Sequence, residues 1–477
     1  MDLVGKRVVV VGLGRSGHAA AALCAREGAT VVVSDSRDED LLRQEVAELV
    51  QRGARIEVWA GAQALEVFRG ADLVVVSPGV PPLAVLDEVA SQGVEVIGEL
   101  ELASRFLEAP ILAVGGTNGK STTTTLLAAL VAASGKRTFA GGNLGTPLSE
   151  AIDPGSDEEL YEALVVEVSS FQLERVREFR PRVNLLLNVS EDHLDRYPDF
   201  DSYVSAKGNS FLRQAPKDVA VIPCGDEVIL AQARRGQARV VTFGLDSVGE
   251  ADFAAVLTPE PGVLDRARGD FYGLKDADLH GAHNVLNAAA AIAGAREFGV
   301  EPDAIRQGLA SFRGLPHRMQ RVDQVEGVTF YDDSKATNVG SAVTALLGLA
   351  EPKGVLIAGG RDKHGSYAPL VDALAEKGRA LVLIGEAADR IAEAVGDRVR
   401  VARAGSMQEA VSLAHSLAQI GEAVLLSPAC SSFDMFQNYH DRGVRFVEAV
   451  KQLKTARVAA GAASDGGSGE PGMEAER

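Results

Sequence analysis

The sequence predicts a large α/β protein of three domains, each built around a parallel sheet. Along most of the 477 residues, short apolar segments that are typical of buried strands alternate with helical patterns. At about 150 residues per domain, this length predicts about three domains. Hydrophobic residues make up 46% of the chain, enough to fill several cores.

Composition narrows the possible functions. The net charge of −18 and the pI near 5.0 argue against nucleic acid and against an anionic membrane as partner, because both carry negative charge. Cys24, Cys224 and Cys430 are too far apart for a C-x-x-C motif and too few for a disulfide framework. No signal-peptide pattern and no apolar run of about 18 residues occurs. We therefore expect a cytoplasmic protein without membrane insertion.

The first domain is predicted over residues 1–108 as a Rossmann-like unit. Strand, glycine turn, helix and strand follow one another over residues 7–37. The turn has the pattern G-x-G-x-x-G at residues 12–17, and Asp35 ends the second strand. This pattern is typical of dinucleotide sites, but such a turn binds any pyrophosphate at a helix N-terminus. It predicts the fold and leaves NAD and UDP groups both open.

The second domain is predicted over residues 109–316 and opens with a phosphate-binding loop. A buried strand at 110–114 leads into "GGTNGKSTTTT" at 115–125, which lacks the first Walker glycine because Val114 stands there. The physical requirements are still met. Glycines permit a close backbone approach, Lys120 follows, and hydroxyl groups open the next helix. We interpret this stretch as a nucleotide site.

Two further strand ends in this domain carry chemical groups. Glu167 ends one predicted strand, and His193 follows another. Ligands of parallel sheets bind at the carboxyl ends of strands, so both should lie on the same edge as Lys120. With the hydroxyl of Ser121, Glu167 could begin to supply the oxygen ligands of Mg²⁺ bound with ATP.

The third domain is predicted over residues 317–455 as a second Rossmann-like unit, because strands again alternate with helical patterns. Residues 456–477 lose this periodicity and gain Gly, Ser and Glu, which predicts a disordered tail.

Eight motifs in order, spread over residues 8–443, resemble the Mur ligase family, and most closely its D-glutamate-adding members. The motifs are "GTNGKST", "EVSSFQLE", "NVSEDHLDRY", "YVSAKGNSF", "HNVLNA", "GLPHRMQ", "DDSKATN" and "LLSPACSSFDMF". The resemblance implies a UDP-binding N-terminal domain, a central ATPase domain and a C-terminal domain that admits the amino acid. It also implies the substrates UDP-N-acetylmuramoyl-L-alanine and D-glutamate, with ATP phosphorylating the carboxylate that the amine then attacks. A loop without the first Walker glycine is usual in this family.

The resemblance further implies site residues. The catalytic residues would be Lys120, Glu167, His193 and Lys207. ATP would contact Gly116, Thr117, Asn118, Gly119, Lys120, Ser121, Thr122, Asn284, Asn287, Arg318 and Asp333. Two Mg²⁺ ions would bind Ser121, Glu167, His193 and Lys207, the last as a carbamate formed with CO₂.

The substrate sites follow in the same way. The UDP-substrate would contact Arg15, Ser16, Asp35, Ser36, Arg37 and Asn143. D-Glutamate would contact Lys335, Thr337, Lys363, Ser432 and Tyr439. Arg15 and Tyr439 depart from the family pattern, which more commonly has an apolar residue and phenylalanine there. Spacing alone would put Lys207 on a helix surface.

Other functions remain open at this point. A sister ligase that adds another amino acid is disfavoured, because no "DNPR"-type motif is present and Asn118 replaces the histidine of "GTHGK". Folylpolyglutamate synthase lacks the first domain. An NAD-dependent oxidoreductase, or an inactive nucleotide-binding module, would each explain one motif only.

Overall fold

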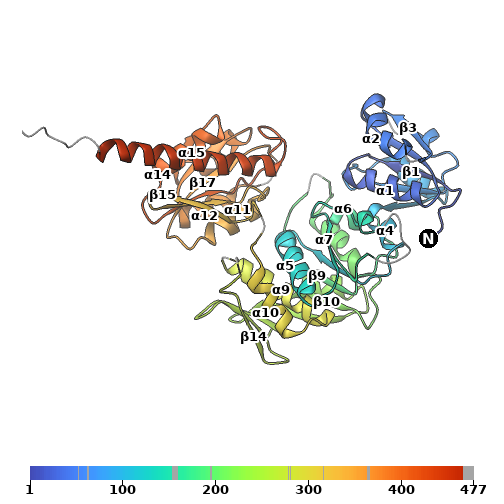
Figure 1. Cartoon of the computed structure of the whole chain (residues 1–477), viewed down its shortest axis with the longest axis horizontal. Coiled ribbons are helices and arrows are strands. Elements are labelled where there is room, and N and C mark those ends of the chain that lie inside the picture. The colour runs from blue at the N-terminus through green and yellow to red at the C-terminus, as the bar shows by residue number, and fades with distance from the viewer. Residues whose placement is uncertain are drawn as a thin grey trace, which may run out of the picture. The chain divides into compact units, whose positions relative to one another are not determined.

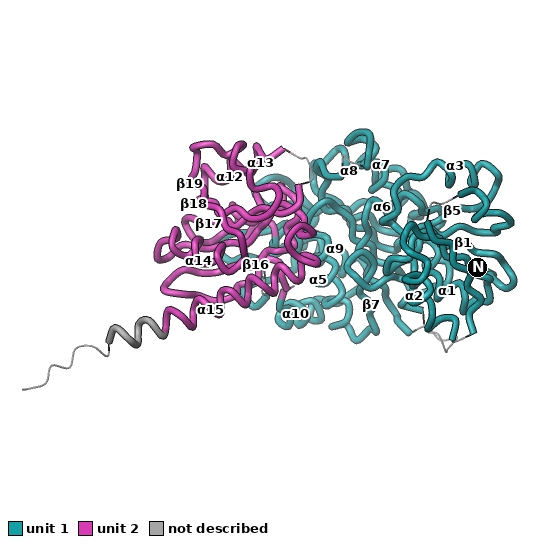
Figure 2. The backbone as a smooth tube through the Cα atoms, turned by 90° about the horizontal axis from the view of Figure 1, so that it is seen from above, with its two compact units in different colours: residues 1–279, 284–313 teal, residues 280–283, 314–477 magenta. Residues whose placement is uncertain are grey.

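The computed structural model describes residues 1–51, 53–61, 64–152, 160–193, 196–277, 279, 281–314, 316–362 and 366–465. The chain divides into two compact units, one of residues 1–279 with 284–313 and one of residues 280–283 with 314–477 (Figure 2). The first unit contains two sheets and the second contains one. Three sheets with helices packed on them confirm the predicted α/β class (Figure 1).

The N-terminal sheet is parallel throughout, with the order β3-β2-β1-β4-β5. Its elements are β1 (Arg7–Val11), α1 (Arg15–Arg26), β2 (Thr30–Asp35), α2 (Glu39–Gln51), β3 (Ile56–Ala60), η1 (Leu65–Phe68), β4 (Leu73–Val76), α3 (Ala84–Ser91), β5 (Glu95–Gly98) and α4 (Glu99–Ser104). Alternate side chains of a strand point to opposite faces, so Val8 and Val10 pack with α1 and α2, while Val9 and Val11 pack with α3. This is the Rossmann order, and its switch point lies between β1 and β4.

The central sheet has nine strands in the order β14-β13-β12-β11-β10-β9-β6-β8-β7. Its strands are β6 (Ile111–Gly115), β7 (Thr138–Gly142), β8 (Ala163–Glu167), β9 (Val183–Leu186), β10 (Val219–Pro223), β11 (Arg239–Leu245), β12 (Phe253–Val256), β13 (Gly262–Asp265) and β14 (Asp270–Gly273). Its helices are α5 (Lys120–Ala133), η2 (Leu148–Ala151), α6 (Ser170–Leu173), α7 (Phe200–Gly208), η3 (Asn209–Phe211), α8 (Glu227–Ala233), α9 (Ala282–Phe298) and α10 (Pro302–Ser311). Buried side chains of α5, α9 and α10 share one core with the strands.

One edge of the central sheet differs from the expected parallel arrangement. Strands β12, β13 and β14 form an antiparallel meander. Each has four residues, so none carries a hydrophobic pattern long enough to be read from the sequence. The meander forms the lateral edge of the sheet that is remote from β6. The carboxyl end of β6 carries the phosphate-binding loop.

The C-terminal sheet has the order β15-β16-β20-β17-β18-β19, with β15 antiparallel to β16. Its elements are β15 (Gln320–Val325), β16 (Val328–Asp332), α11 (Val339–Leu347), β17 (Gly354–Gly359), α12 (Ala368–Lys377), β18 (Gly378–Ile384), α13 (Ala388–Val395), β19 (Arg400–Arg403), α14 (Met407–Leu417), β20 (Ala423–Leu426) and α15 (Tyr439–Asp465). One face packs on α11, α12 and α13, and the other on α14 and α15.

The last helix enters the segment that the sequence predicts to be disordered. Helix α15 continues to Asp465, whereas the disordered tail is predicted from residue 456. The helix thus overlaps the first ten residues of the predicted tail, and the disorder of the tail stays a prediction. Residues 466–477 lie outside the described part of the chain.

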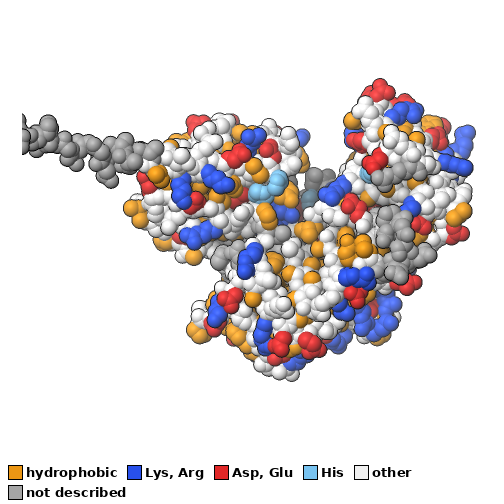
Figure 3. All heavy atoms as spheres, viewed as in Figure 1, with side chains coloured by type: hydrophobic (Ala, Val, Ile, Leu, Met, Phe, Trp, Pro, Cys, Tyr) orange, Lys and Arg blue, Asp and Glu red, His pale blue; other side chains and the backbone are white. Residues whose placement is uncertain are grey.

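The charged side chains on the surface and the length and apolarity of the helices are relevant to possible partners. On the face shown in Figure 3, acidic and basic side chains are interspersed on both units. In the parts of the chain that the structure describes, no helix is both long and apolar enough to cross a membrane.

Candidate active site

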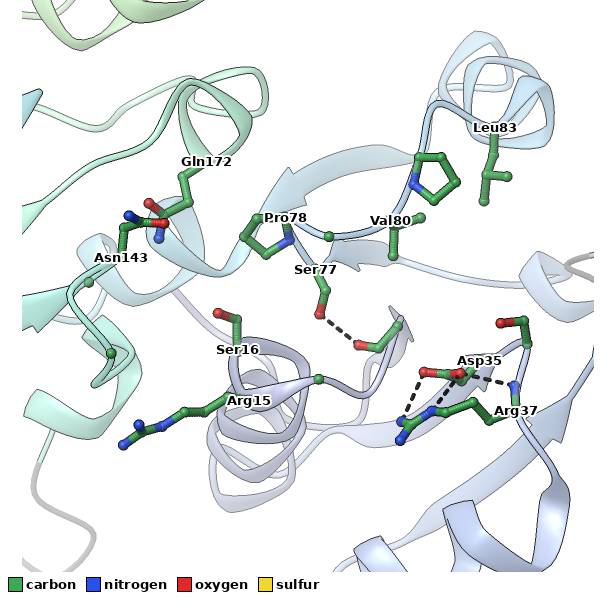
Figure 4. A pocket seen from close by; sticks show the side chains of 17 residues that line it. Arg15, Ser16, Asp35, Arg37, Ser77, Pro78, Val80, Leu83, Asn143 and Gln172 are labelled. Carbon is green, nitrogen blue, oxygen red and sulfur yellow. Dashed lines mark hydrogen bonds and ion pairs between the residues drawn. The ribbon is translucent and has the colours of Figure 1, made fainter. Parts of the chain in front are cut away.

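The first candidate site is a cavity of about 590 Å³ at the carboxyl ends of β1, β2 and β4, the place where Rossmann folds bind nucleotides. Its lining includes all six residues predicted to contact the UDP-substrate: Arg15, Ser16, Asp35, Ser36, Arg37 and Asn143. Asp35 and Arg37 lie at one end of it, and Asn143 and Gln172 lie at the other (Figure 4). Both domains of the first unit therefore form this cavity. That these residues bind UDP remains a prediction, and the name "UDP cavity", used below for this cavity, refers to that prediction.

The glycine pattern of the first turn has a steric reason. Gly12 has φ +82°, and a Cβ on Gly17 would lie 1.9 Å from the carbonyl oxygen of Gly12. Ser77, from the loop after β4, donates its hydroxyl to that same oxygen at 2.7 Å. The turn after β1 is thus fixed against the loop after β4, and residues of both segments line the cavity.

Asp35 is held by several donors. The N–H of Leu13 donates to its Oδ2 at 2.7 Å, and Arg37 donates to it from the backbone N–H and from the guanidinium. Burial alone would raise the pKa of Asp35, but the hydrogen bonds from Arg37 and Leu13 outweigh it and lower the pKa. Glu45 holds the same guanidinium at 2.9 Å. This end of the cavity therefore presents a fixed, charged carboxylate and a fixed guanidinium.

Arg15 begins helix α1 and stays largely exposed. Its Nε lies 3.8 Å from Oε1 of Glu150. Its side chain extends away from Asp35 in Figure 4.

The phosphate-binding loop connects β6 to α5, as predicted. Gly119 caps the helix with φ +82°, and Gly116 has φ +144°, values that favour glycine. Asn188, which follows β9, braces the loop by accepting from the N–H of Asn118 at 2.9 Å and donating to its carbonyl oxygen at 3.1 Å. Thr117 bonds Ser190 in the same segment. The backbone is thus preorganised at the N-terminus of α5, where anions bind.

Lys120 folds over this loop. Its Nζ donates to the carbonyl oxygens of Gly116 and Thr117, at 2.8 and 2.7 Å. Ser121 and Thr122 are buried in the first turn of α5.

Glu167 ends β8 and is buried beside the loop. Nδ2 of Asn143 donates to its Oε1 at 2.6 Å, and Asn143 also lines the UDP cavity. One asparagine side chain therefore connects the cavity to a carboxylate at the carboxyl ends of the central strands, where the phosphate-binding loop also lies.

His193 lies on the same edge, after β9. It adopts a left-handed conformation, with φ 56°, and its ring lies 4.7 Å from that of Phe171 and 6.3 Å from that of Tyr203. Its Nε2 is 3.8 Å from Oδ2 of Asp192.

Lys207 does not lie on a helix surface, the place that spacing alone would give it. It is 3% exposed, its Nζ donates to the carbonyl oxygen of Gly116 at 2.8 Å, and the Tyr203 ring lies 4.6 Å away. Burial and the charge of Lys120 hold the pKa of Lys207 well below its usual value, and Asp192 and Glu167 oppose this only in part. The amine is therefore shifted toward its neutral form.

Within the described ranges, no group of three or more His, Cys, Asp or Glu side chains is arranged to hold a metal ion. The set predicted to hold Mg²⁺ contains two such side chains, Glu167 and His193, and is completed by the Ser121 hydroxyl and Lys207.

The remaining predicted ATP residues are divided between the two units. In α9, Nδ2 of Asn287 donates to Oδ1 of Asn284 at 3.2 Å, and the Asn287 side chain packs on Gly119. In the second unit, Asp333 is buried and accepts from the Ser427 hydroxyl at 2.8 Å. Burial raises the pKa of Asp333 to about 7, against the lowering effects of Ser427 and Arg318.

The residues predicted for D-glutamate belong to the second unit. Nζ of Lys335 lies 5.1 Å from the centre of the Tyr439 ring, and the N–H of Thr337 donates to the Lys335 carbonyl oxygen at 2.9 Å. Ser432 is buried. Lys363 lies outside the described residues.

Sequence reasoning missed two residues that support these sites. Gln172 lines the UDP cavity, whereas the sequence indicates only the motif "EVSSFQLE" that contains it. Arg442 is fully buried and donates to the hydroxyl and carbonyl oxygens of Ser334 and to the carbonyl oxygen of Cys430. It thereby joins the segments that carry Lys335, Ser432 and Tyr439. An arginine near the start of a helix gives no signal in the sequence that it will be buried.

Three family models match consecutive parts of the chain. They are the Mur ligase MurD-like N-terminal domain over residues 6–98, the Mur ligase middle domain over 114–295 and the Mur ligase glutamate ligase domain over 317–430.

Whole-chain relatives agree with these models. The UDP-N-acetylmuramoylalanine–D-glutamate ligase of Geobacter metallireducens is 44% identical over 459 residues, covering 95% of this chain and 99% of that protein. The enzyme of the same name from Pelobacter propionicus is also 44% identical over 459 residues, covering 95% of this chain and all of that protein, 100%.

Solved structures show the same fold. A MurF ligase from Thermotoga maritima in complex with ADP aligns with a TM-score of 0.61 and 17% identity, over 96% of this chain and 100% of that one. The UDP-N-acetylmuramate-alanine ligase MurC from the same bacterium aligns with a TM-score of 0.58 and 21% identity, over 94% of this chain and 100% of that one. Since the family models cover most of the chain and the relatives match nearly its whole length, the chain belongs to the Mur ligase family.

Proposed function

We propose that this protein joins D-glutamate to UDP-N-acetylmuramoyl-L-alanine with cleavage of ATP to ADP and phosphate, a step of peptidoglycan precursor synthesis in the cytoplasm. The names of the whole-chain relatives and the MurD-like N-terminal domain support this substrate pair. The observation that carries the chemistry is Asn143, which both lines the UDP cavity and donates to Glu167 beside the phosphate-binding loop. A substrate held in that cavity would direct its carboxylate toward the loop.

The loop residues would hold the phosphates of ATP. The backbone N–H groups at the start of α5 would donate to phosphate oxygens, and the macrodipole of the helix favours negative charge there. Lys120 would release the loop carbonyl oxygens and place its charge on the transferred phosphoryl group. The substrate carboxylate attacks the γ-phosphorus, the bond to ADP breaks, and an acyl phosphate forms.

Two Mg²⁺ ions fit this donor set, since Ser121, Glu167, His193 and a carbamate on Lys207 would hold them with phosphate oxygens. When bound, they would offset the repulsion between the carboxylate and the triphosphate.

Lys207 meets the chemical requirement for carbamylation. A neutral amine attacks CO₂ and loses one proton to give a carboxylate, and the lowered pKa of Lys207 favours that neutral amine. The negative charge of the product would be stabilised by Lys120, whose positive charge destabilises the ammonium form.

The C-terminal unit would supply the second substrate. Lys335, Thr337, Lys363, Ser432 and Tyr439 would fix the two carboxylates of D-glutamate so that its amine faces the acyl phosphate. The amine attacks the acyl carbon, phosphate leaves, and an amide remains.

An amino-acid panel tests this function. The purified protein is incubated with UDP-N-acetylmuramoyl-L-alanine, Mg-ATP and, separately, D-glutamate, L-glutamate, L-alanine or meso-diaminopimelate, and ADP and amide product are measured. Of the four amino acids, we expect only D-glutamate to support substantial turnover, because a site built on paired buried polar groups rejects a misfit by up to about 10⁴-fold. Preference for another amino acid would assign the chain to a sister ligase. Oxidation or reduction of a nicotinamide cofactor without ADP release would instead favour the oxidoreductase.

A further inference from the structure

Two motifs end in residues that the proposed chemistry does not use, and these residues meet in space. Glu174 ends "EVSSFQLE", and Arg196 and Tyr197 end "NVSEDHLDRY". The Arg196 guanidinium donates to both carboxylate oxygens of Glu174, Nε at 3.0 Å and Nη2 at 2.7 Å. The Tyr197 hydroxyl donates to Oε1 of Glu174 at 2.6 Å. The Arg196 and Glu174 side chains are only 13% and 23% exposed, so this two-pronged pair is shielded from water.

The third nitrogen of the same guanidinium reaches the N-terminal domain. Nη1 of Arg196 donates to the carbonyl oxygen of Val80 at 3.0 Å. Val80 belongs to the loop after β4, and its side chain lines the UDP cavity (Figure 4). Arg196 therefore fixes one wall of that cavity to the central domain.

The other side of Arg196 supports His193. The guanidinium lies 4.3 Å above the Phe171 ring, which also packs against the imidazole ring of His193, 4.7 Å away. The backbone N–H groups of Arg196 and Tyr197 donate to the His193 carbonyl oxygen, at 2.9 and 3.1 Å. These bonds close the turn in which His193 takes its left-handed conformation, which a residue other than glycine keeps only where the surroundings enforce it.

We propose that Arg196, held by Glu174, is a positioning residue that couples the Val80 wall of the UDP cavity to the His193 turn, so that binding of the UDP-substrate and phosphoryl transfer depend on it together. This inference rests on the proposed function. Lysine cannot replace the arginine, because three separate acceptors and a ring face require the planar fork of the guanidinium.

Arg196→Lys and Glu174→Gln test the inference, with Arg180→Lys as the matched control. Arg180 also makes a two-pronged pair with a buried carboxylate, that of Asp218, but unlike Arg196 it has no described hydrogen bond to a residue that lines the UDP cavity. For each variant we would measure the dissociation constant of UDP-N-acetylmuramoyl-L-alanine by calorimetry, and the KM values and kcat of D-glutamate-dependent ADP release.

We expect Arg196→Lys to weaken binding of the UDP-substrate by about tenfold and to lower kcat by about tenfold, with the KM for ATP changed by less than about twofold. Glu174→Gln should do the same to a smaller degree. The double variant should be no worse than Arg196→Lys, because both changes break one network. Arg180→Lys should leave all three constants unchanged.

Three results would overturn the inference: kinetic constants of Arg196→Lys equal to those of the wild type, additive effects of the two changes, or an equal loss in Arg180→Lys. If circular dichroism shows that Arg196→Lys does not fold, the constants of Glu174→Gln alone test the inference. Calorimetry separates this inference from the proposed function: absence of D-glutamate-dependent turnover in the wild type refutes the function, whereas unchanged affinity of the variants for the UDP-substrate refutes the role of Arg196.

Discussion

Gly119→Ala is a direct perturbation of the phosphate-binding loop. Gly119 has φ +82°, where an L-residue costs about 1–2 kcal/mol. The new Cβ would also lie 2.3 Å from Oδ1 of Asn287, so that side chain must move and lose its hydrogen bond to Asn284, at about 1 kcal/mol. The sum is about 2–3 kcal/mol against the loop conformation. At 1.4 kcal/mol per factor of ten, ATP affinity should fall about 30- to 140-fold.

Gly135→Ala is the matched control, because Gly135 follows the other end of α5 with φ +88° and nothing lies within 4 Å of an added Cβ. Titration calorimetry with a non-hydrolysable ATP analogue measures both variants. Gly135→Ala should keep the wild-type affinity for the ATP analogue. Its thermal midpoint should still fall, because alanine is strained at this positive φ as well. If Gly119→Ala binds the analogue as tightly as Gly135→Ala does, the loop geometry described above is not what holds ATP.

Three further predictions concern single side chains. Lys120→Ala should bind the UDP-substrate normally in calorimetry but release ADP about 10²–10³-fold more slowly, and wild-type turnover would remove Lys120 from the mechanism. Lys207→Ala should be nearly inactive and regain part of its activity with added acetate or formate, and mass spectrometry of the native wild type at raised CO₂ should detect the carbamate; inactivity that no carboxylate relieves would argue against a carbamate. The pKa of Asp35 is lowered in the folded protein, so this carboxylate stabilises the fold fully above its unfolded pKa of about 3.9, and the effect is lost as the pH falls from there through the lower pKa of the folded state. The difference in thermal midpoint between wild type and Asp35→Asn should therefore be largest near pH 7 and shrink toward pH 3, and a difference that does not change with pH would contradict this.

The parts of the fold that the sequence predicts are those with local signals. The phosphate-binding loop could be placed because a buried strand, glycines and a hydroxyl-rich helix start stand next to each other. The same holds for the turn after β1, where Gly12 and Gly17 are required by a conformation and a close contact that act over a few residues. The antiparallel strands β12 to β14 were missed, because each is too short to show a periodicity.

The environments of side chains were not predictable in this way. Lys207 lies on a helix with mixed polarity, where Tyr203 packs on it from one turn earlier on the same helix, and its amine is hydrogen-bonded to Gly116, which a segment distant in sequence brings to it. Arg442 and the pair of Glu174 with Arg196 likewise depend on contacts between segments that are distant in sequence. The resemblance to a family supplied the predicted role of Lys207, and the structure supplied the reason that its amine is shifted toward neutral.

Oxygen transfer from the substrate to phosphate tests the central claim most directly. UDP-N-acetylmuramoyl-L-alanine labelled with ¹⁸O in both carboxyl oxygens is converted with D-glutamate and unlabelled Mg-ATP, and the released phosphate and the amide product are analysed by mass spectrometry. If the carboxylate attacks ATP and the amine then displaces phosphate, one labelled oxygen appears in each phosphate and one remains in the amide. Phosphate without label, formed together with the amide, would show that no acyl phosphate connects the two sites.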